Sequence, residues 1–131
     1  MTKVTPFLMF QGEAEEALNY YISTFKDAEI IHLSRNVEDG PGKVGELSQA
    51  TFSINGQEFL CMDSDIQHAF TFTPSISLFV ECDSENEIDE VYAKLAEGGK
   101  LLMPIDNYPF SKKFGWVQDK FGVSWQLNLS K

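Results

Sequence analysis

The fold is decided by the stretch TPSISLFVECDSENEIDEVYAKL, residues 73–95, which reads as a strand that runs directly into a helix. Apolar residues alternate with their neighbours from position 75 to position 80, which is the two-residue period of a strand. Ser84 then stands three residues before Glu87, the spacing of a capping box at a helix N-terminus. The predicted helix has one apolar face and ends at Gly98-Gly99. That face is made by Ile88, Val91, Tyr92 and Leu95.

The same strand-helix phrase occurs once before, at the N-terminus of the chain. Residues 6–10 form an apolar run without alternation, which predicts a short strand that is buried on both faces. Gln11-Gly12 then turns the chain into a predicted helix over about residues 13–25. Its expected buried stripe is Ala14, Ala17, Leu18, Tyr21 and Phe25. This internal repeat predicts two copies of one structural unit.

Each predicted helix is followed by three expected strands. They span residues 28–35, 47–54 and 57–63 in the first half, where Asn55-Gly56 is a hairpin turn. In the second half they span 100–103, where Pro104 breaks the strand, then 114–119 and 123–129, and residues 106–113 are expected to form a loop. We therefore predict an α+β fold with two βαβββ modules, about 1–66 and 74–131, in a single domain over 1–131. The modules are expected to form curved mixed sheets around a trough, with the helices on the outer faces.

Strand alternation predicts which side chains face this trough. In the last strand Trp125, Leu127 and Leu129 are expected under the helix, so Ser124, Gln126 and Asn128 face the trough. A concave face of amides, hydroxyls and aromatic rings suits a small molecule. The candidate ligand-binding residues are Gln49, Ser77, Phe79, Trp116 and Gln126. The loops at 36–46 and 108–113 are expected lids. The alternative occupants of these faces are a second subunit and the protein's own side chains.

The bulk composition excludes several classes of partner. The chain of 131 residues has a net charge of -10, which disfavours binding to nucleic acids and to anionic membrane surfaces. No apolar run approaches the roughly 18 residues that span a bilayer. The chain starts without the basic segment and apolar core of a signal peptide, so a cytoplasmic protein is expected. Cys61 and Cys82 are therefore expected to be reduced thiols.

Candidate catalytic groups are scarce in the sequence. Cys61 has no histidine nearby in sequence, and neither Ser75 nor Ser77 has an evident base, so the catalytic residues stay unknown. Arg35, Lys112 and Lys113 could hold an anionic group at the mouth of the trough, and a solvated charge is the alternative for each.

Several phrases of the sequence resemble a known family. They are TPFLMF at 5–10, AEEA at 14–17, FSINGQ at 52–57 and FGWVQDKFGVSWQL at 114–127. With the paired βαβββ units, they resemble the vicinal oxygen chelate superfamily of glyoxalases, bleomycin-resistance proteins and dioxygenases, and within it the PhnB-like, 3-demethylubiquinone-9 3-methyltransferase-like subgroup. The resemblance implies a homodimeric enzyme that acts on a small molecule. Lyase and transferase chemistry are the two reaction types that it suggests. The alternative is a non-catalytic protein that sequesters a ligand, of the resistance type.

The resemblance also implies where a metal site would lie. Metal-dependent relatives place histidine or glutamate ligands on the first and last strands of each unit, and the corresponding positions are Pro6, a residue near Leu60, Ser77 and Gln126. None of these is an ionisable ligand, so neither a metal nor a cofactor is expected. A non-standard site that involves Glu58, Asp63 or His32 is left open. No glycine-rich strand-to-helix loop occurs, so the residues do not support a methyltransferase that binds a nucleotide-type cofactor.

Overall fold

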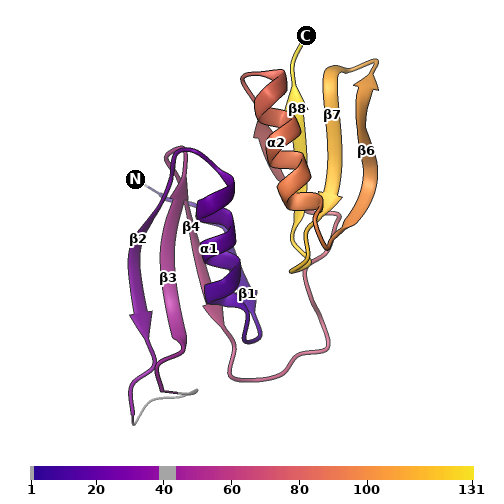
Figure 1. Ribbon diagram of the computed structural model, residues 1–131. Coiled ribbons are helices and arrows are strands. Elements are labelled where there is room, and N and C mark those ends of the chain that lie inside the picture. Colours follow the sequence, from indigo (N-terminus) through magenta and orange to yellow (C-terminus); the bar gives the residue numbers. More distant parts are fainter. Residues whose placement is uncertain (1, 39–43) are drawn as a thin grey trace. The chain divides into compact units, whose positions relative to one another are not determined.

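The computed structural model describes residues 2–38 and 44–131, and the chain divides into two compact units between His68 and Ala69. Each unit contains one helix and one four-stranded sheet (Figure 1). The predicted α+β fold with two modules is therefore confirmed. Among the described residues, neither helix is long and apolar enough to cross a membrane.

The first unit follows the order β-α-β-β-β. Its elements are β1 (Phe7–Phe10), α1 (Ala14–Thr24), β2 (Ala28–Arg35), β3 (Leu47–Ile54) and β4 (Gln57–Asp63). The sheet order is β1-β4-β3-β2, in which β1 runs parallel to β4 and the other pairs are antiparallel. The turn between β3 and β4 has positive φ at both Asn55 (49°) and Gly56 (85°), which confirms the predicted hairpin.

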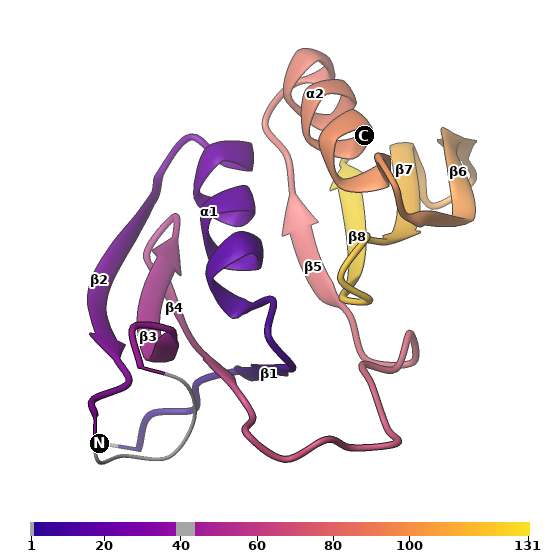
Figure 2. The same cartoon turned by 60° about the horizontal axis from the view of Figure 1, so that its bottom comes forward.

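The second unit repeats this topology. Its elements are β5 (Leu78–Glu81), α2 (Glu85–Ala96), β6 (Lys100–Tyr108), β7 (Ser111–Gln118) and β8 (Ser124–Leu129). The sheet order is β5-β8-β7-β6, and only β5 and β8 are parallel. Figure 2 shows each helix against its own sheet: α1 packs on β2, β3 and β4, and α2 packs on β6, β7 and β8. The shared trough and the single domain stay predictions.

The two helix N-termini are capped in different ways. In α2 the Glu87 N–H donates to Ser84 Oγ at 3.1 Å, as in a capping box. The Glu87 side chain accepts from the N–H of Asp83 at 2.6 Å, one residue before the Ser84 N–H that a capping box uses. Glu13 gives α1 no side-chain cap. Instead Asp63, at the end of β4, accepts from the N–H groups of Gly12 and Ala14 at 2.8 and 2.9 Å. The predicted buried faces of both helices are confirmed.

Four predicted features were wrong. β5 begins at Leu78, because residues 74–75 form a turn and Ile76, at 72% exposure, lies outside the sheet. β6 continues past Pro104 as far as Tyr108. Because β6 is the edge strand and its pairing with β7 is irregular around Pro104, the sheet does not need an N–H from the proline. The expected 106–113 loop, and with it the second lid, shrinks to a turn at residues 109–110. β1 alternates rather than being buried on both faces, because Phe7 is 51% exposed.

The β7–β8 hairpin is held by one buried carboxylate. Asp119 Oδ1 accepts from the N–H groups of Phe121 at 2.9 Å and Val123 at 3.0 Å. Its Oδ2 accepts from the indole N–H of Trp125 at 2.9 Å. Trp125 is 1% exposed, which confirms its predicted place in the core. This cluster fixes the start of β8, and with it the register of the polar residues further along the strand.

Candidate functional site

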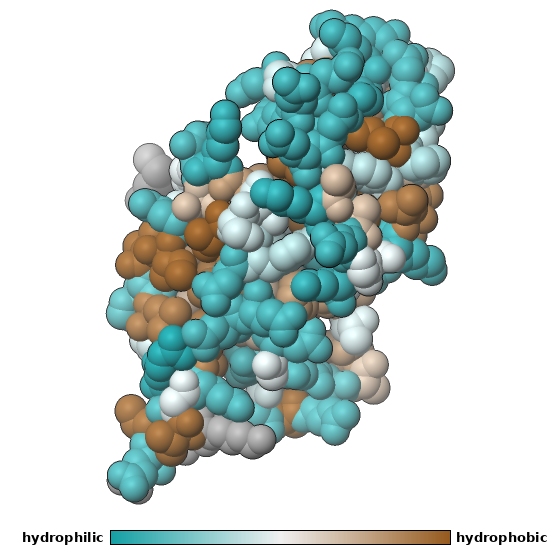
Figure 3. Space-filling view, in the orientation of Figure 1, coloured by the Kyte–Doolittle hydropathy of each residue, from teal (hydrophilic) through white to brown (hydrophobic). Residues whose placement is uncertain are grey.

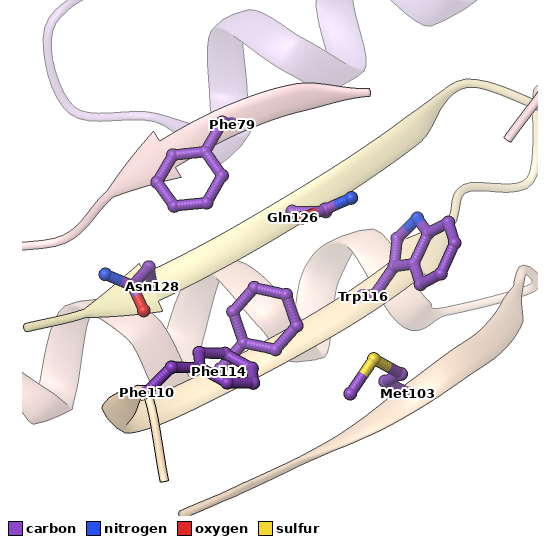
Figure 4. Close-up of a pocket in the computed structure, with 7 residues that line it drawn as sticks. All are labelled: Phe79, Met103, Phe110, Phe114, Trp116, Gln126 and Asn128. Carbon is purple, nitrogen blue, oxygen red and sulfur yellow. The ribbon is translucent and has the colours of Figure 1, made fainter. Parts of the chain in front are cut away.

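The sheet face of the second unit that points away from α2 carries a hollow of about 470 Å³ (Figure 4). We call it the aromatic pocket. Strands β5, β6, β7 and β8 and the turn after β6 all contribute to it. The lining residues are Phe79, Met103, Phe110, Phe114, Trp116, Gln126 and Asn128. The opposite side chains of β8, such as Leu127, are buried on the α2 side, as the alternation predicts.

The centre of the pocket is a row of residues that crosses the whole sheet. Phe79 pairs with Gln126 across β5 and β8, and Gln126 pairs with Trp116 across β8 and β7. Met103 then pairs with Trp116 across β6 and β7. Paired residues share a face of the sheet and lie about 5 Å apart. The register therefore places an amide between two aromatic rings, with a thioether at the end of the row.

A chain of hydrogen bonds lies beside this row. The indole N–H of Trp116 donates to Ser124 Oγ at 2.8 Å. Ser124 Oγ lies 2.6 Å from Ser77 Oγ, and the Gln126 amide nitrogen donates to Ser77 Oγ at 3.3 Å. Ser124 is buried at 2% exposure, so these hydroxyls are committed to the chain. The chain holds the indole ring and the Gln126 amide in fixed orientations.

The second amide, at Asn128, is held from both of its ends. Its nitrogen donates to Glu81 Oε1 at 2.8 Å, and its oxygen accepts from the hydroxyl of Ser111, which is fully buried. Glu81 also accepts from the N–H and the hydroxyl of Ser130. The hydrogen bond from Asn128, with those from Ser130, holds the pKa of Glu81 below its usual value.

Aromatic rings form the wall at the β6–β7 turn. The Phe110 and Phe114 rings meet edge to face with centroids 5.0 Å apart, and Phe110 stacks on Tyr108 at 5.6 Å. Phe110 is 63% exposed and Phe79 is 59% exposed. Rings of this size that gather around one hollow mark a surface for an apolar partner.

The structure brings some of the predicted binding residues together. Phe79, Trp116 and Gln126 line the aromatic pocket, and Ser77 contacts the Gln126 amide from beside it. Gln49 lies in the other unit, on β3, exposed and opposite Ser34 of β2. Ligand binding by these five residues stays a prediction.

Four lining residues were not among those candidates. Alternation placed Asn128 on this face, and Phe114 was expected as part of the 114–119 strand. Met103 lies inside the predicted 100–103 strand, whose two faces were not assigned, and Phe110 lies in the turn at residues 109–110, where alternation gives no prediction.

The other candidate reactive groups are buried thiols, paired cations or, at one position, an exposed lysine. Burial raises the pKa of Cys61 to about 11 and that of Cys82 to about 12, so both thiols stay protonated at neutral pH. Arg35 forms a two-pronged ion pair with Glu15, with both N–O distances at 2.8 Å, and Lys113 pairs with Asp89 at 2.8 Å. Lys112 is exposed. Residues 39–43 of the expected 36–46 lid lie outside the described residues.

The residues of the aromatic pocket do not fit the metal ion that the superfamily implies. They offer amides and a thioether where zinc, iron or manganese takes imidazole, thiolate or carboxylate. Across residues 2–38 and 44–131, no three histidine, cysteine or acidic side chains form a group that could hold a metal ion. Of the three residues left open, Glu58 pairs with Lys3, Asp63 caps α1, and His32 Nε2 lies 3.0 Å from Ser34 Oγ.

Comparison with known proteins identifies the family. The family model described as 3-demethylubiquinone-9 3-methyltransferase matches residues 2–128. A PhnB protein from Bacillus cereus is 59% identical, with 98% of this chain and 100% of that chain covered and a TM-score of 0.94. Protein YjdN of Escherichia coli K12 is 23% identical over 98% of this chain and 95% of its own length.

A more distant structure shows the breadth of the fold. The glyoxylase/bleomycin resistance protein/dioxygenase domain from Frankia sp. EAN1pec is 14% identical, with 100% of this chain and 93% of that chain covered and a TM-score of 0.69. The resemblance read from the sequence phrases is therefore confirmed. The chain belongs to the 3-demethylubiquinone-9 3-methyltransferase (PhnB-like) family and has the fold of the glyoxalase and bleomycin-resistance proteins.

Proposed function

We propose that this PhnB-like protein binds a small, flat organic molecule in the aromatic pocket. The observation that carries the proposal is the set of four aromatic rings and one thioether around two oriented amides. A hollow of about 470 Å³ is within the range of roughly 300–1,000 Å³ that small-molecule sites occupy. A flat ligand would cover the exposed faces of Phe79 and Phe110, and this burial would contribute to affinity.

The pocket favours binding over catalysis, which reverses the order in which the sequence alone ranked the two roles. Its described lining residues carry no ionisable side chain that could act as a base or an acid, and the nearby Ser77 and Ser124 hydroxyls bond to each other. Sequestration of a ligand, as in resistance proteins, is therefore the leading role. An enzymatic role in transferase or lyase chemistry is the second candidate, and the description of the family as methyltransferases supports it.

Tryptophan fluorescence tests the proposal because the two indoles lie on opposite faces of one sheet. Trp116 lines the pocket and Trp125 is buried on the α2 side. Flat, uncharged fragments should quench the emission of Trp116 in a saturable way. Trp116→Phe should abolish this response while Trp125 still reports a folded protein. Saturable quenching that persists in Trp116→Phe would place binding elsewhere, and turnover of a bound fragment would favour the enzymatic role.

We further propose that the protein is a cytoplasmic homodimer built from single-domain subunits. Hydrophobic side chains gather over β2 on the face shown in Figure 3, and Ile30 and Ile31 of this strand are 40% and 49% exposed. β2 is an edge strand, and exposed apolar edges are usually covered by a partner. The buried, unpaired thiols of Cys61 and Cys82 suit a reducing compartment.

A further inference from the structure

We propose that the ligand of the aromatic pocket is an uncharged aromatic molecule with an N–H or O–H donor on its edge, and that Gln126 Oε1 accepts this hydrogen bond. The inference rests on the proposed function and specifies its ligand. It follows from a difference between the two amides of the pocket, from the hydrogen bond that the Gln126 nitrogen makes with Ser77, and from the lack of ionisable residues in the described lining.

The amide of Asn128 is already bonded to protein partners at both of its ends. Its nitrogen donates to Glu81 at 2.8 Å and also lies 3.3 Å from Ser130 Oγ, while its oxygen accepts from the Ser111 hydroxyl. A ligand that bonded to the nitrogen would have to displace Glu81 or Ser130, and the oxygen is already held by the buried Ser111 hydroxyl. Asn128 therefore acts as a fixed wall of the pocket.

In the amide of Gln126, only the nitrogen has a protein partner among the described residues. The indole N–H of Trp116 can only donate, so Ser124 Oγ must accept from it. Ser124 in turn bonds to Ser77, and Ser77 Oγ accepts from the Gln126 nitrogen at 3.3 Å. The nitrogen of Gln126 thus points towards Ser77, and Oε1 lies on the other side of the amide.

Within the described part of the chain, no group donates to Gln126 Oε1. No buried side-chain nitrogen or oxygen of these residues lacks a partner, so this unpaired oxygen is accessible. Figure 4 shows Gln126 among the rings of Phe79, Trp116 and Phe114. A donor on the edge of a stacked aromatic ligand would therefore meet this acceptor.

The residues that line the pocket also disfavour the binding of a charged ligand. None of its seven residues is ionisable, and Lys113, the basic residue beside Phe114 in β7, pairs with Asp89 of α2. An ionic ligand would lose hydration on entering an aromatic hollow, and the Glu81 carboxylate beside Asn128 is already bonded to Asn128 and Ser130. A neutral ligand avoids this cost and keeps the one polar contact that the pocket offers.

Two ring-matched probes test the inference. Indole carries an edge N–H donor, and 1-methylindole has the same rings without it. Protein-observed NMR titration of the wild type should show indole binding about fivefold more tightly, the effect of one neutral hydrogen bond. Indole-3-carboxylate, which keeps the donor and adds a charge, should bind at least about tenfold more weakly than indole.

Substitution of Gln126 locates the acceptor. Gln126→Met keeps the length of the side chain and removes the carbonyl, so the preference for indole should fall to about one while 1-methylindole binds as before. Gln57→Met, the same change at an exposed position of β4, should leave both affinities unaltered. If Gln126→Met lowers stability, Ser77→Ala gives a second test, since it frees the amide to rotate and should also reduce the preference.

The possible results separate this inference from the proposed function. Equal binding of indole and 1-methylindole to the wild type would overturn the inference and leave the aromatic pocket intact as a site. A preference for indole that survives both Gln126→Met and Ser77→Ala would remove Gln126 as the acceptor. Tighter binding of indole-3-carboxylate than of indole would contradict selection against charge. Failure of every probe to bind would overturn the proposed function and the inference together.

Discussion

Replacement of Asp119 by alanine should strongly destabilise the second unit, because one carboxylate organises the β7–β8 hairpin. The change removes the acceptor of three N–H donors. The N–H of Val123 and the indole N–H of Trp125 belong to residues that are 3% and 1% exposed, so water cannot replace the lost oxygens. A buried unpaired donor costs roughly 1–3 kcal/mol, and two of them give a loss of roughly 2–6 kcal/mol in the free energy of unfolding.

Denaturant unfolding of Asp119→Ala, Asp119→Asn and Trp125→Phe measures this loss. Asp119→Asn keeps one acceptor oxygen and should cost about half as much as the alanine change. Combining Asp119→Ala with Trp125→Phe should cost less than the sum of the two single changes, because the shared bond is lost only once. A free energy of unfolding for Asp119→Ala within about 1 kcal/mol of the wild type would refute the reasoning.

Four further predictions concern packing, thiols, cooperativity and assembly. Gly115→Ala should lower stability by about 1–3 kcal/mol in thermal melts, because its Cβ would lie 2.9 Å from the Tyr92 ring; an unchanged melting temperature would contradict this. Cys61 and Cys82 should resist alkylation at neutral pH until the protein is denatured, and rapid labelling of the native protein would contradict their burial. The free energy of unfolding should also fall as the pH rises from the ordinary thiol range through about 11, because the thiols ionise at lower pH in the unfolded chain than in the folded one. Tryptophan fluorescence, which reports only the second unit, should follow the same unfolding transition as circular dichroism if the chain is one domain, and two separate transitions would show two. Sedimentation at micromolar concentration should give twice the 14.8 kDa of the chain, and a monomer alone would argue against dimerisation.

The topology could be predicted because local signals agreed with long-range packing. The bounds of β2, β3 and β4 follow directly from alternation and from the Asn55-Gly56 turn, whose two positive φ values few other dipeptides adopt. The apolar face of α2 at Ile88, Val91 and Leu95 likewise needs only the helical period. Each of these signals lies within one element or one hairpin.

The candidate site was harder to predict because it depends on strand register and on partners that are distant in sequence. Pro104 suggested a break, whereas only the sheet order shows that β6 is an edge strand that tolerates it. Met103 lies just before Pro104 and Phe110 lies in the turn after β6, so their place in the pocket depends on the pairing of β6 with β7. Likewise, Asn128 and Gln126 are the same kind of residue two positions apart, and only their partners Glu81, Ser111 and Ser77 show that, within the described chain, Asn128 is bonded at both ends of its amide and Gln126 at one.

The most direct test of the account is a crystal structure of the protein with bound indole. We expect density for the indole ring against Phe79 and Trp116, with its N–H within hydrogen-bond distance of Gln126 Oε1. The Asn128 amide should keep its bonds to Glu81 and Ser111 in the complex. Indole bound elsewhere on the protein, with the aromatic pocket filled only by solvent, would contradict the assignment of the aromatic pocket as the ligand site.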